Sequence, residues 1–542
     1  MDAALIALLD GDLVESPEHV GIALLAAVLR EASLSSAILA IDPGGDHAAI
    51  EELRQLAPKV VGLTLTTVNL PRAVVFGGRV RAILPGAHIV LGGPLATAIG
   101  PSLLRLPGWE FANSLVRGEA EGMIAAFVEA AATGRPVAHL PGVCVRGVPP
   151  SPTVAHVEDL SALPWPARDQ AERRRLPYLR LSTSRGCTSR CAFCDAPNAA
   201  NRPKGAKPWR GRDPMDVVDE IEALVRSHAI DTFDFVDSTF EDPGGGAVGK
   251  QRVRAIADEI LRRGLRVFFN CCIQAQNWTE DDVGLIALLR EAGLEKVMVG
   301  AEAGSQRSLE RYGKRASVAD NLRAAGLFQA AKVFVAQGFI MFDPYTDFAD
   351  LDANADFLRR TVGYNLRRYL TRLELYPGTA ILDRIRADGL LAAEYDTTLR
   401  PYAYSFRDPR IGALATQLAR LSGADYAHSG RMGRPPPVVE FETFDIRTFT
   451  YYSRLERRMG HDPRHADAIA EGLAAVDAVR AGLAELAYAF FADATDRARR
   501  DRPVVADELA HVNRRYAEAM EDIKAIGLRT GMRLRRARAG AA

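Results

Sequence analysis

Three cysteines crowded into one short stretch are the residues best suited to chemistry in this sequence. The stretch reads Ser184-Arg-Gly-Cys-Thr-Ser-Arg-Cys-Ala-Phe-Cys194, so Cys187, Cys191 and Cys194 follow a C-x3-C-x2-C spacing. A [4Fe–4S] cluster has four irons, and three thiolate ligands leave one of them open to a small molecule. We therefore expect these thiols to hold a [4Fe–4S] cluster with one open iron.

Structural zinc is the alternative for closely spaced cysteines. Zinc normally takes four protein ligands, commonly as two separated C-x2-C pairs or with added histidines. The sequence near the three cysteines offers no such partner. The spacing therefore favours the cluster over zinc.

Further motifs follow the cysteines in a fixed order at the ends of predicted strands. They are Phe235-Val-Asp-Ser-Thr-Phe240, Val299-Gly-Ala-Glu-Ala-Gly-Ser305 and Leu375-Tyr-Pro-Gly-Thr379. Together with the cysteine motif they resemble the radical S-adenosylmethionine superfamily, and the resemblance spans residues 1 to about 385. It implies that the open iron binds S-adenosylmethionine, which the reduced cluster cleaves to a 5'-deoxyadenosyl radical.

The resemblance also implies which side chains contact that cofactor. They are Phe193, Asp237, Ser238, Thr239 and Glu302, the last as an acceptor for the ribose hydroxyls. Structural alternatives stay open, because Asp237 could cap a turn and Glu302 could pair with Lys314. We interpret the motif at 375–379 as a structural turn.

Two features depart from the family pattern or fall outside it. The usual Gly-x-Pro-Gly-x-Thr turn after the fifth strand is replaced by Phe342-Asp-Pro-Tyr-Thr346, which leaves cofactor contacts there in doubt. Cys271 and Cys272 end the third strand, where alternation sends only one of them inward. We interpret this pair as core filling, with a redox or substrate-facing role as the alternative.

The first part of the chain carries a second set of motifs. Val61-Gly-Leu-Thr-Leu-Thr66, Leu91-Gly-Gly-Pro94 and Arg117-Gly-Glu-Ala-Glu121 resemble those of cobalamin-binding radical enzymes, whereas a nucleotide or no ligand is the alternative for such a domain. Glycines lack a Cβ atom and let a flat ligand approach the backbone. The cobalamin contacts that the resemblance implies are Thr64, Thr66, Asn69, Leu70, Gly92, Gly93, Pro94, Gly118 and Glu119.

The lower axial ligand of the cobalt is a separate question. The D-x-H-x-x-G signature that supplies a histidine in many cobalamin proteins is absent, and the nearest sequences are Glu18-His-Val-Gly21 and Asp46-His47. We favour a cobalamin without a histidine ligand, its lower face near Asn69 or Leu70. His19 is the alternative ligand.

Two series of alternating strands and helices must position these residues. The first series has predicted strands at 5–9, 37–41, 59–64, 88–91 and 115–117, and ligand-binding loops at 10–20, 66–70 and 92–97. The second has strands at 179–182, 233–236, 267–269, 296–300, 333–340 and 372–376. Its helices have start signals at Asp213-Pro214, at Thr279 with Asp282, and at Ser317 with Asp320.

We therefore predict an α/β protein with four parts. They are a doubly wound, flavodoxin-like or Rossmann-like cobalamin-binding domain at 1–147, a proline-rich linker at 148–177, a partial (β/α)6 barrel at 178–385 and a mostly helical, substrate-capping domain at 386–542. In the last part, an apolar stripe on one helix face predicts core packing; its residues are Leu473, Val476, Val479, Leu483, Leu486 and Phe490. The aromatic residues Tyr395, Tyr402, Tyr404, Phe406, Phe441 and Phe444 are expected to shape a substrate pocket or to fill the core.

Composition narrows the partners and the compartment. Lys plus Arg and Asp plus Glu are both 68, so no net charge is available to bind a nucleic-acid backbone. Six cysteines with three in one motif indicate a reducing compartment, and no export signal or membrane-spanning stretch is evident. We expect a cytoplasmic protein with a small-molecule substrate, an external electron donor of the flavodoxin or ferredoxin type, and neither nucleic acid nor membrane as a partner.

Both cofactors together predict a function. A methyl group carried by methylcobalamin could be delivered to a carbon from which the 5'-deoxyadenosyl radical has removed hydrogen. The prediction is an enzyme that methylates a carbon of a small natural product, as in antibiotic biosynthesis. A cobalamin-dependent radical cyclase or ring-rearranging enzyme without methyl transfer, and a non-catalytic cobalamin-responsive protein, are the alternatives.

Overall fold

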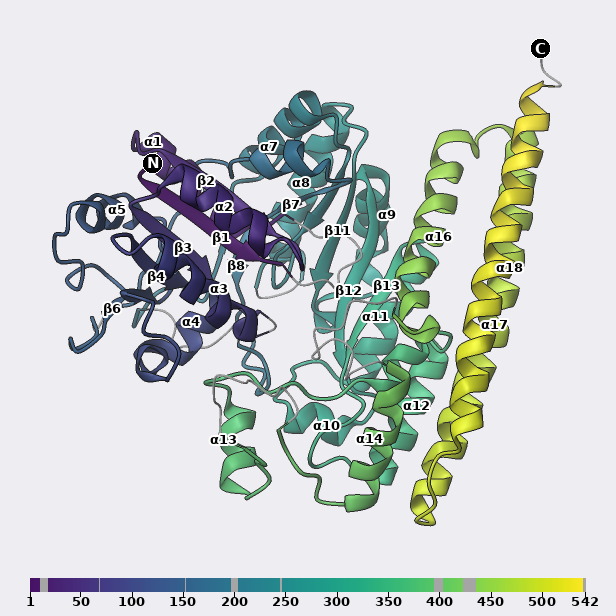
Figure 1. The fold of residues 1–542 in the computed structure, drawn as a ribbon. Coiled ribbons are helices and arrows are strands. Elements are labelled where there is room, and N and C mark those ends of the chain that lie inside the picture. Colours follow the sequence, from purple (N-terminus) through teal and green to yellow (C-terminus); the bar gives the residue numbers. More distant parts are fainter. Residues whose placement is uncertain are drawn as a thin grey trace. The chain divides into compact units, whose positions relative to one another are not determined.

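The computed structural model describes most of the 542 residues in two compact units. The described residues are 1–9, 18–67, 69–151, 153–195, 203–243, 246–393, 403–422 and 435–539. The first unit comprises 1–272 and 374–403, and the second comprises 273–373 and 404–542. Figure 1 shows the helices and strands of both units.

The front of the first unit is a six-stranded sheet in the order β2-β1-β3-β4-β5-β6. Its strands are β1 (Ala3–Leu8), β2 (Ser36–Ile41), β3 (Val60–Thr64), β4 (His88–Gly92), β5 (Ser114–Val116) and β6 (Val143–Val145). The first five pair in parallel, as predicted, whereas β6 is an unpredicted antiparallel edge strand. The carboxyl ends of the parallel strands therefore share one edge.

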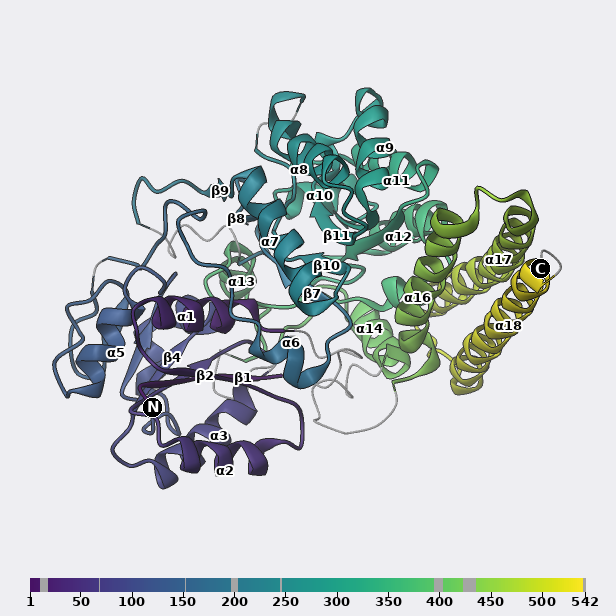
Figure 2. The same ribbon diagram turned by 90° about the horizontal axis from the view of Figure 1, so that it is seen from above.

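Helices cover both faces of this sheet (Figure 2). They are α1 (Val20–Glu31), α2 (Asp46–Leu56), α3 (Leu70–Ile83), α4 (Pro94–Ile99) and α5 (Ile124–Ala132). Alternation along β1 assigns the faces, because Leu5 packs in one core with residues of α1 and α5, and Ile6 packs in another with residues of α2 and α3. The doubly wound prediction is confirmed.

The predicted linker is more ordered than its prolines suggested. It contains a short helix, α6 (Asp169–Arg174), directly after the buried Arg168. Arg168 donates to the carboxylate of Glu18 and, at 2.7 Å, to that of Glu220. A buried arginine between two buried carboxylates fastens the front sheet to the next part of the first unit.

That next part contains a second parallel sheet in the order β11-β10-β7. Its strands are β7 (Leu179–Leu181), β10 (Thr232–Phe235) and β11 (Phe268–Ile273). Helix α7 (Pro214–His228) lies between β7 and β10 in the chain, and α8 (Gln251–Arg262) lies between β10 and β11. Between β7 and α7 an antiparallel pair interrupts the pattern, formed by β8 (Ser184–Gly186) and β9 (Trp209–Gly211). The sequence pattern did not reveal this hairpin.

The second unit begins with strand and helix pairs and ends in long helices. The elements of its first half are α9 (Val283–Ala292), β12 (Leu294–Glu302), α10 (Gln306–Arg311), α11 (Val318–Ala330), β13 (Phe334–Phe339) and α12 (Phe348–Thr361), with β12 and β13 parallel. The sixth predicted strand, at 372–376, is reduced in the described chain to one parallel bridge between Phe342 and Arg372.

The helical end of the second unit comprises α14 (Pro409–Ser422), α16 (Pro437–Met459), α17 (Pro463–Arg499) and α18 (Ala506–Ala539). Helices α17 and α18 lie side by side along their length (Figures 1 and 2). Val476, Leu483 and Phe490 of the predicted apolar stripe are buried in the core of this part. The stripe is therefore core packing, as expected.

Local signals in the sequence were read correctly. Asp213 caps α7, accepting from the backbone N–H of Met215 at 2.8 Å. Thr279 with Asp282 and Ser317 with Asp320 both form capping boxes.

The described part of the chain contains no helix with the length and hydrophobicity of a membrane span. The boundaries between the four predicted parts stay predictions.

Candidate functional site

The cysteine motif begins inside β8 and continues as a loop. Cys187, Cys191 and Cys194 are all partly exposed, and none of the chain's six cysteines forms a disulfide. The backbone N–H of Ser189 donates to Sγ of Cys187 at 3.4 Å, and the N–H of Cys194 donates to the carbonyl of Cys191 at 3.2 Å. Within the described ranges, no three His, Cys, Asp or Glu side chains converge as ligands of one metal ion. The loop offers three partly exposed thiols, a donor set that fits a cluster with one iron open.

Asp237, predicted as a cofactor contact, binds the start of this loop. Its Oδ1 accepts hydrogen bonds from the backbone N–H groups of Thr183 at 2.8 Å and Ser184 at 2.9 Å, and its Oδ2 accepts from the Thr183 hydroxyl. Burial raises the pKa of Asp237 above its ordinary value, although these hydrogen bonds oppose the rise. Asp237 therefore caps the turn at the start of the loop, as the structural alternative proposed. A direct contact with the cofactor stays a prediction.

The two residues after Asp237 differ in environment. Ser238 is exposed, whereas Thr239 is buried and its carbonyl accepts from the Ser184 hydroxyl at 3.1 Å. The Thr239 hydroxyl is buried without a hydrogen-bond partner among the described residues. Such a group has hydrogen-bonding capacity left for a ligand.

Arg252 of α8 stabilises the same region, a role that no sequence motif indicated. Its guanidinium donates to the Thr183 carbonyl at 3.3 Å, to the Phe240 carbonyl at 2.5 Å and to Asp242 at 2.7 Å. The base of the cluster loop is therefore held by one anion and one cation. Asp237 was predicted as part of the site, whereas Arg252 lies far along the chain from the cysteines and was not predicted.

The predicted turn at 375–379 is confirmed and lies beside the cluster loop. The Thr379 hydroxyl donates to the Tyr376 carbonyl at 2.7 Å, which closes the turn before α13 (Ala380–Ala387). The backbone N–H of Ile381 then donates to the carbonyl of Ala192, between two of the cysteines, at 2.9 Å. Phe193 is partly exposed in the same loop.

The carboxyl edge of the front sheet holds the predicted cobalamin residues. Asn69 is buried: its Oδ1 accepts from the N–H of Thr66 at 2.9 Å, and its Nδ2 donates to the Thr64 carbonyl at 3.1 Å. Leu70 is completely buried in the core, Thr64 is buried and Pro94 is exposed. Asn69 and Leu70 thus shape the loop after β3, and a corrinoid contact through them stays a prediction.

The three glycines of this edge have different reasons to be glycine. A Cβ on Gly93, at φ +92°, would lie 2.5 Å from Oγ1 of Thr64, and one on Gly118, at φ +87°, would lie 2.1 Å from the Ala155 carbonyl oxygen. Close backbone packing therefore requires both. A Cβ on Gly92 would meet no atom of the described residues within 4 Å. Of the three glycines, Gly92 alone leaves space among the described residues that a bound ligand could fill.

Glu119 accepts hydrogen bonds from two groups of the chain, and its predicted contact with cobalamin stays a prediction. Arg210 donates to both its oxygens, at 2.7 and 2.8 Å, and the N–H of Val157 donates at 2.8 Å. Burial alone would raise the pKa of Glu119, but these donors and Arg185 outweigh it and lower that pKa. The neighbouring Glu121 accepts from Arg185 at 2.8 Å. The motif at 117–121 thus binds the β8–β9 hairpin that leads into the cysteines.

The alternative axial ligand, His19, caps α1. Its Nδ1 accepts from the backbone N–H of Ile22 at 3.4 Å, and burial lowers its pKa to about 4. The ring is therefore neutral and already used by the helix. Residues 10–17 of the predicted ligand-binding loop at 10–20 lie outside the described residues.

Glu302 ends β12 in the second unit. Its backbone has φ +64°, and its Oε1 lies 3.6 Å from Nζ of Lys314. A Cβ on Gly300 would lie 2.8 Å from that oxygen, so the glycine makes room for the carboxylate. A non-glycine residue at positive φ is often part of a functional site. Both interpretations of Glu302 remain consistent with this geometry.

The divergent turn at 342–346, also in the second unit, is held internally. Asp343 is buried and accepts from Arg311 at 2.6 Å, from the Tyr312 hydroxyl at 2.5 Å and from the N–H of Tyr345 at 2.6 Å. The carboxylate of Asp343 is therefore engaged within the chain.

In the first unit, Cys271 is buried and Cys272 partly exposed, as alternation required.

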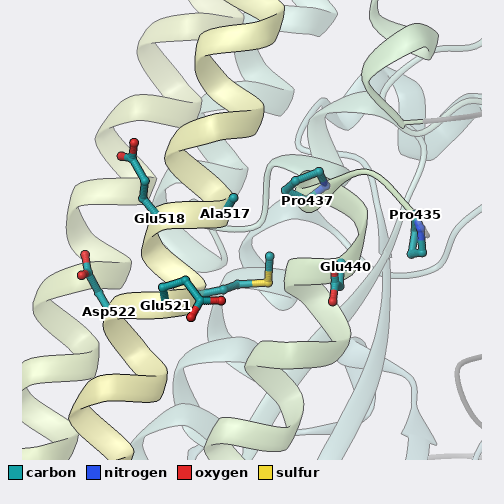
Figure 3. Close-up of a pocket in the computed structure, with 8 residues that line it drawn as sticks. Pro435, Pro437, Glu440, Ala517, Glu518, Glu521 and Asp522 are labelled. Atoms are coloured by element: carbon teal, nitrogen blue, oxygen red, sulfur yellow. The ribbon is translucent and has the colours of Figure 1, made fainter.

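A surface pocket of about 490 Å³ lies between the start of α16 and the middle of α18 (Figure 3). Glu440, Glu518, Glu521 and Asp522 line it, together with Pro435, Pro437, Ala517 and Met520. No predicted aromatic residue lines this pocket. Phe441 and Tyr404 are buried, Phe406 and Phe444 are partly buried, and Tyr395 and Tyr402 lie outside the described residues.

Comparison with known families identifies both halves of the predicted site. Residues 181–358 match the Radical SAM superfamily, and residues 12–128 match the B12 binding domain. The first match includes the cysteine motif, Asp237 and Glu302. The second includes the loops after β3, β4 and β5.

Relatives and solved structures agree with this division. An uncharacterized methyltransferase of Pyrococcus horikoshii is 24% identical over 387 residues, which are 68% of this chain and 79% of the relative. An anaerobic magnesium-protoporphyrin IX monomethyl ester cyclase of Rubrivivax gelatinosus is 28% identical over 54% of this chain, but the match spans only 52% of the cyclase. The cobalamin-dependent S-adenosylmethionine radical enzyme OxsB, solved with aqua-cobalamin and S-adenosylmethionine, aligns with a TM-score of 0.67 at 17% identity, over 96% of this chain and 83% of that one.

The OxsB likeness extends through the helical end of the chain and establishes the same overall architecture. The family matches supply the cofactors that this architecture serves. A radical S-adenosylmethionine domain uses a [4Fe–4S] cluster and S-adenosylmethionine, and the B12 binding domain uses cobalamin. The chain therefore combines a segment that matches the B12 binding domain with a segment that matches the Radical SAM superfamily, on the fold of a cobalamin-dependent radical S-adenosylmethionine enzyme.

Proposed function

We propose that this enzyme methylates a carbon atom of a small natural-product substrate. The observation that carries the proposal lies within the first unit, where ion pairs join the carboxyl edge of the front sheet to the hairpin before Cys187. A corrinoid at that edge and a cluster on that loop would then be neighbours. The methyltransferase among the relatives supports the same chemistry.

The bound cofactors supply a methyl group carried on cobalt and a radical able to remove a hydrogen atom from an unactivated carbon. The residues of this chain hold and orient them. Cys187, Cys191 and Cys194 would ligate three irons, and Asp237 holds the base of their loop through Thr183 and Ser184. Gly92 leaves space at the edge where the corrinoid would bind.

Two side chains are proposed as contacts of S-adenosylmethionine, one in each unit. Thr239 has a buried hydroxyl without a partner in the described chain, and Glu302 presents a carboxylate at the end of β12. A carboxylate is a strong acceptor for the two ribose hydroxyls. No acidic or basic side chain is required for the methyl transfer itself, which fits a site built from cofactor ligands.

A labelled methyl donor tests the proposal. Anaerobically reconstituted enzyme would be incubated with S-adenosylmethionine carrying a trideuteromethyl group, a reductant and candidate heteroaromatic substrates such as pyrroles. Mass spectrometry should find a product with the full label, together with S-adenosylhomocysteine and 5'-deoxyadenosine. A product without the label would reject methyl transfer.

The second candidate function is cyclisation or ring rearrangement without methyl transfer. The cyclase relative favours it, although it matches this chain over only about half of its own length. The same experiment separates the two functions, because a cyclase would consume S-adenosylmethionine to 5'-deoxyadenosine without forming S-adenosylhomocysteine. A flavodoxin or ferredoxin as electron donor, a cytoplasmic location and the absence of nucleic-acid partners belong to either proposal.

A further inference from the structure

Two glutamates of the B12 binding domain and two arginines of the cluster hairpin form one compact set of charges. Arg185 and Arg210 lie directly opposite each other in the β8–β9 pair. Arg185 donates to Glu121 at 2.8 Å and lies 3.6 Å from Glu119, and Arg210 binds both oxygens of Glu119. We refer to Glu119, Glu121, Arg185 and Arg210 as the clamp.

Each ion pair of the clamp has one buried and one partly exposed member. The side chains of Glu121 and Arg210 are each 6% exposed, whereas those of Arg185 and Glu119 are 21% and 23% exposed. Removing one partner of a buried ion pair leaves an uncompensated charge, whereas the intact pair contributes little net stability. A buried pair of this kind therefore specifies a geometry more than it adds stability.

The hairpin depends on the glutamates for a second reason. Like charges directly opposite each other on neighbouring strands repel. Arg185 and Arg210 form such a pair, and Glu119 and Glu121 neutralise it. Without these carboxylates the strand that ends at Gly186, one residue before Cys187, would be destabilised.

The clamp also continues into the loops of the candidate cobalamin edge. The N–H of Gly118 donates to Oγ1 of Thr97 at 3.1 Å, and that hydroxyl donates to the carbonyl of Gly93 at 3.0 Å. Glu119 follows Gly118 directly. A continuous series of hydrogen bonds and ion pairs therefore runs from the loop after β4 to the residue two positions before the first cluster cysteine.

We propose that the clamp is a positioning device that sets the place of the cluster loop relative to the bound corrinoid. Its four residues contact neither reacting atom and act through the hairpin and the loop at 117–121. The inference rests on the two cofactors and not on the reaction proposed above, so either can fail without the other. It applies equally to a methyltransferase and to a cyclase.

The test measures the spin–spin interaction between cob(II)alamin and the reduced cluster by electron paramagnetic resonance. It uses the reconstituted holoenzyme, with iron and cobalt counted for every variant. We expect Glu121→Gln and Arg185→Gln each to retain both cofactors but to lose the single defined interaction of the parent enzyme. The charge-exchanged variant, Glu121→Arg with Arg185→Glu, should regain it in large part.

The matched control is the exposed ion pair between Arg173 and Glu52, at 3.1 Å, which also joins the front domain to a later segment. Arg173→Gln and Glu52→Gln should leave the interaction unchanged. Arg185→Lys retains the charge, and it provides a milder variant in case the glutamine variants do not fold. An unchanged interaction in all the clamp variants, or no regain on charge exchange, would overturn the proposal.

Discussion

Oδ1 of Asp237 accepts a hydrogen bond from the backbone N–H of Ser184 at 2.9 Å, three residues before the first cluster cysteine. A side chain at the end of β10 thereby fixes the place where β7 gives way to the cluster loop. Because Asp237 is buried, the loop's geometry depends on its carboxylate remaining in place.

The first prediction is that Asp237→Asn loses cluster without losing the fold. The amide keeps the size but gives up the charge and one acceptor, which should cost about 1–3 kcal/mol at a buried site. We expect less iron and sulfide per chain after reconstitution, with a thermal unfolding midpoint a few degrees lower.

The control for that prediction is Asp234→Asn, three residues earlier in β10. Asp234 is partly exposed and lies 3.7 Å from Arg180 of β7. Its iron content should match that of the parent. If Asp237→Asn also binds the full complement of iron, the positioning role of Asp237 is wrong.

A second prediction separates the two adjacent glycines of the cobalamin edge. Gly93→Ala should destabilise the apoprotein by about 2 kcal/mol or more, because the new Cβ clashes with Thr64 and positive φ strains it. Gly92→Leu should leave stability nearly unchanged and weaken hydroxocobalamin binding, measured by absorbance titration. Normal cobalamin affinity in Gly92→Leu would mean that the space beside Gly92 is not the ligand site.

The third prediction concerns Glu302. Glu302→Gln should weaken S-adenosylmethionine binding about tenfold, because charge-assisted hydrogen bonds to the ribose are lost. Isothermal titration calorimetry on the reconstituted enzyme measures this affinity.

Glu295 offers a matched comparison on the same strand, since Arg454 binds both oxygens of its carboxylate, at 2.9 and 2.8 Å. Glu295→Gln should lower stability and leave that affinity alone. Equal affinities in Glu302→Gln and the parent would assign Glu302 to its ion pair with Lys314 instead.

The fourth prediction is a loss of stability at acidic pH that depends on His19. Its pKa is about 4 when folded and 6.5 in the ordinary state, so the unfolded chain takes up the proton first. Its contribution to stability is therefore complete above about pH 6.5 and is lost as the pH falls toward 4. At pH 5 the loss should reach about 2 kcal/mol at most.

Asparagine also caps helices well but does not titrate, so His19→Asn should show a weaker pH dependence of the unfolding midpoint. The comparison variant is His47→Asn, in the first turn of α2. Identical pH profiles for the parent and His19→Asn would contradict the prediction.

Most of the fold was predictable because its signals are local. The parallel strands at 5–9 and 59–64 show as short apolar runs, and the capping boxes at Thr279 and Ser317 have a fixed spacing. The antiparallel strand β6 and the β8–β9 hairpin were missed. Strands β6, β8 and β9 are each three residues long, too short for a period to emerge. They also lie outside the alternation of parallel strands and helices that located the equally short β5 and β7.

The site was predictable in its ligands and not in its supports. The spacing of the three cysteines alone predicts a cluster. By contrast, the ion pair between Arg210 and Glu119 joins residues that are 91 positions apart in the sequence. The motif at 117–121 predicted cobalamin contacts, which stay predictions. In the structure Arg210 binds Glu119, and close packing against Ala155 requires a glycine at Gly118. Long-range ion pairs leave no periodic trace, so only a structure could reveal them.

The most direct test of the central claim needs no substrate. Holoenzyme would be reduced and mixed with trideuteromethyl-labelled S-adenosylmethionine, and the corrinoid would then be extracted in the dark for mass spectrometry. We predict a trideuteromethyl group on the corrinoid together with S-adenosylhomocysteine, and reductant-dependent 5'-deoxyadenosine that disappears in Cys191→Ala. A corrinoid that stays unlabelled while 5'-deoxyadenosine accumulates would contradict methyl transfer through this enzyme's cobalamin.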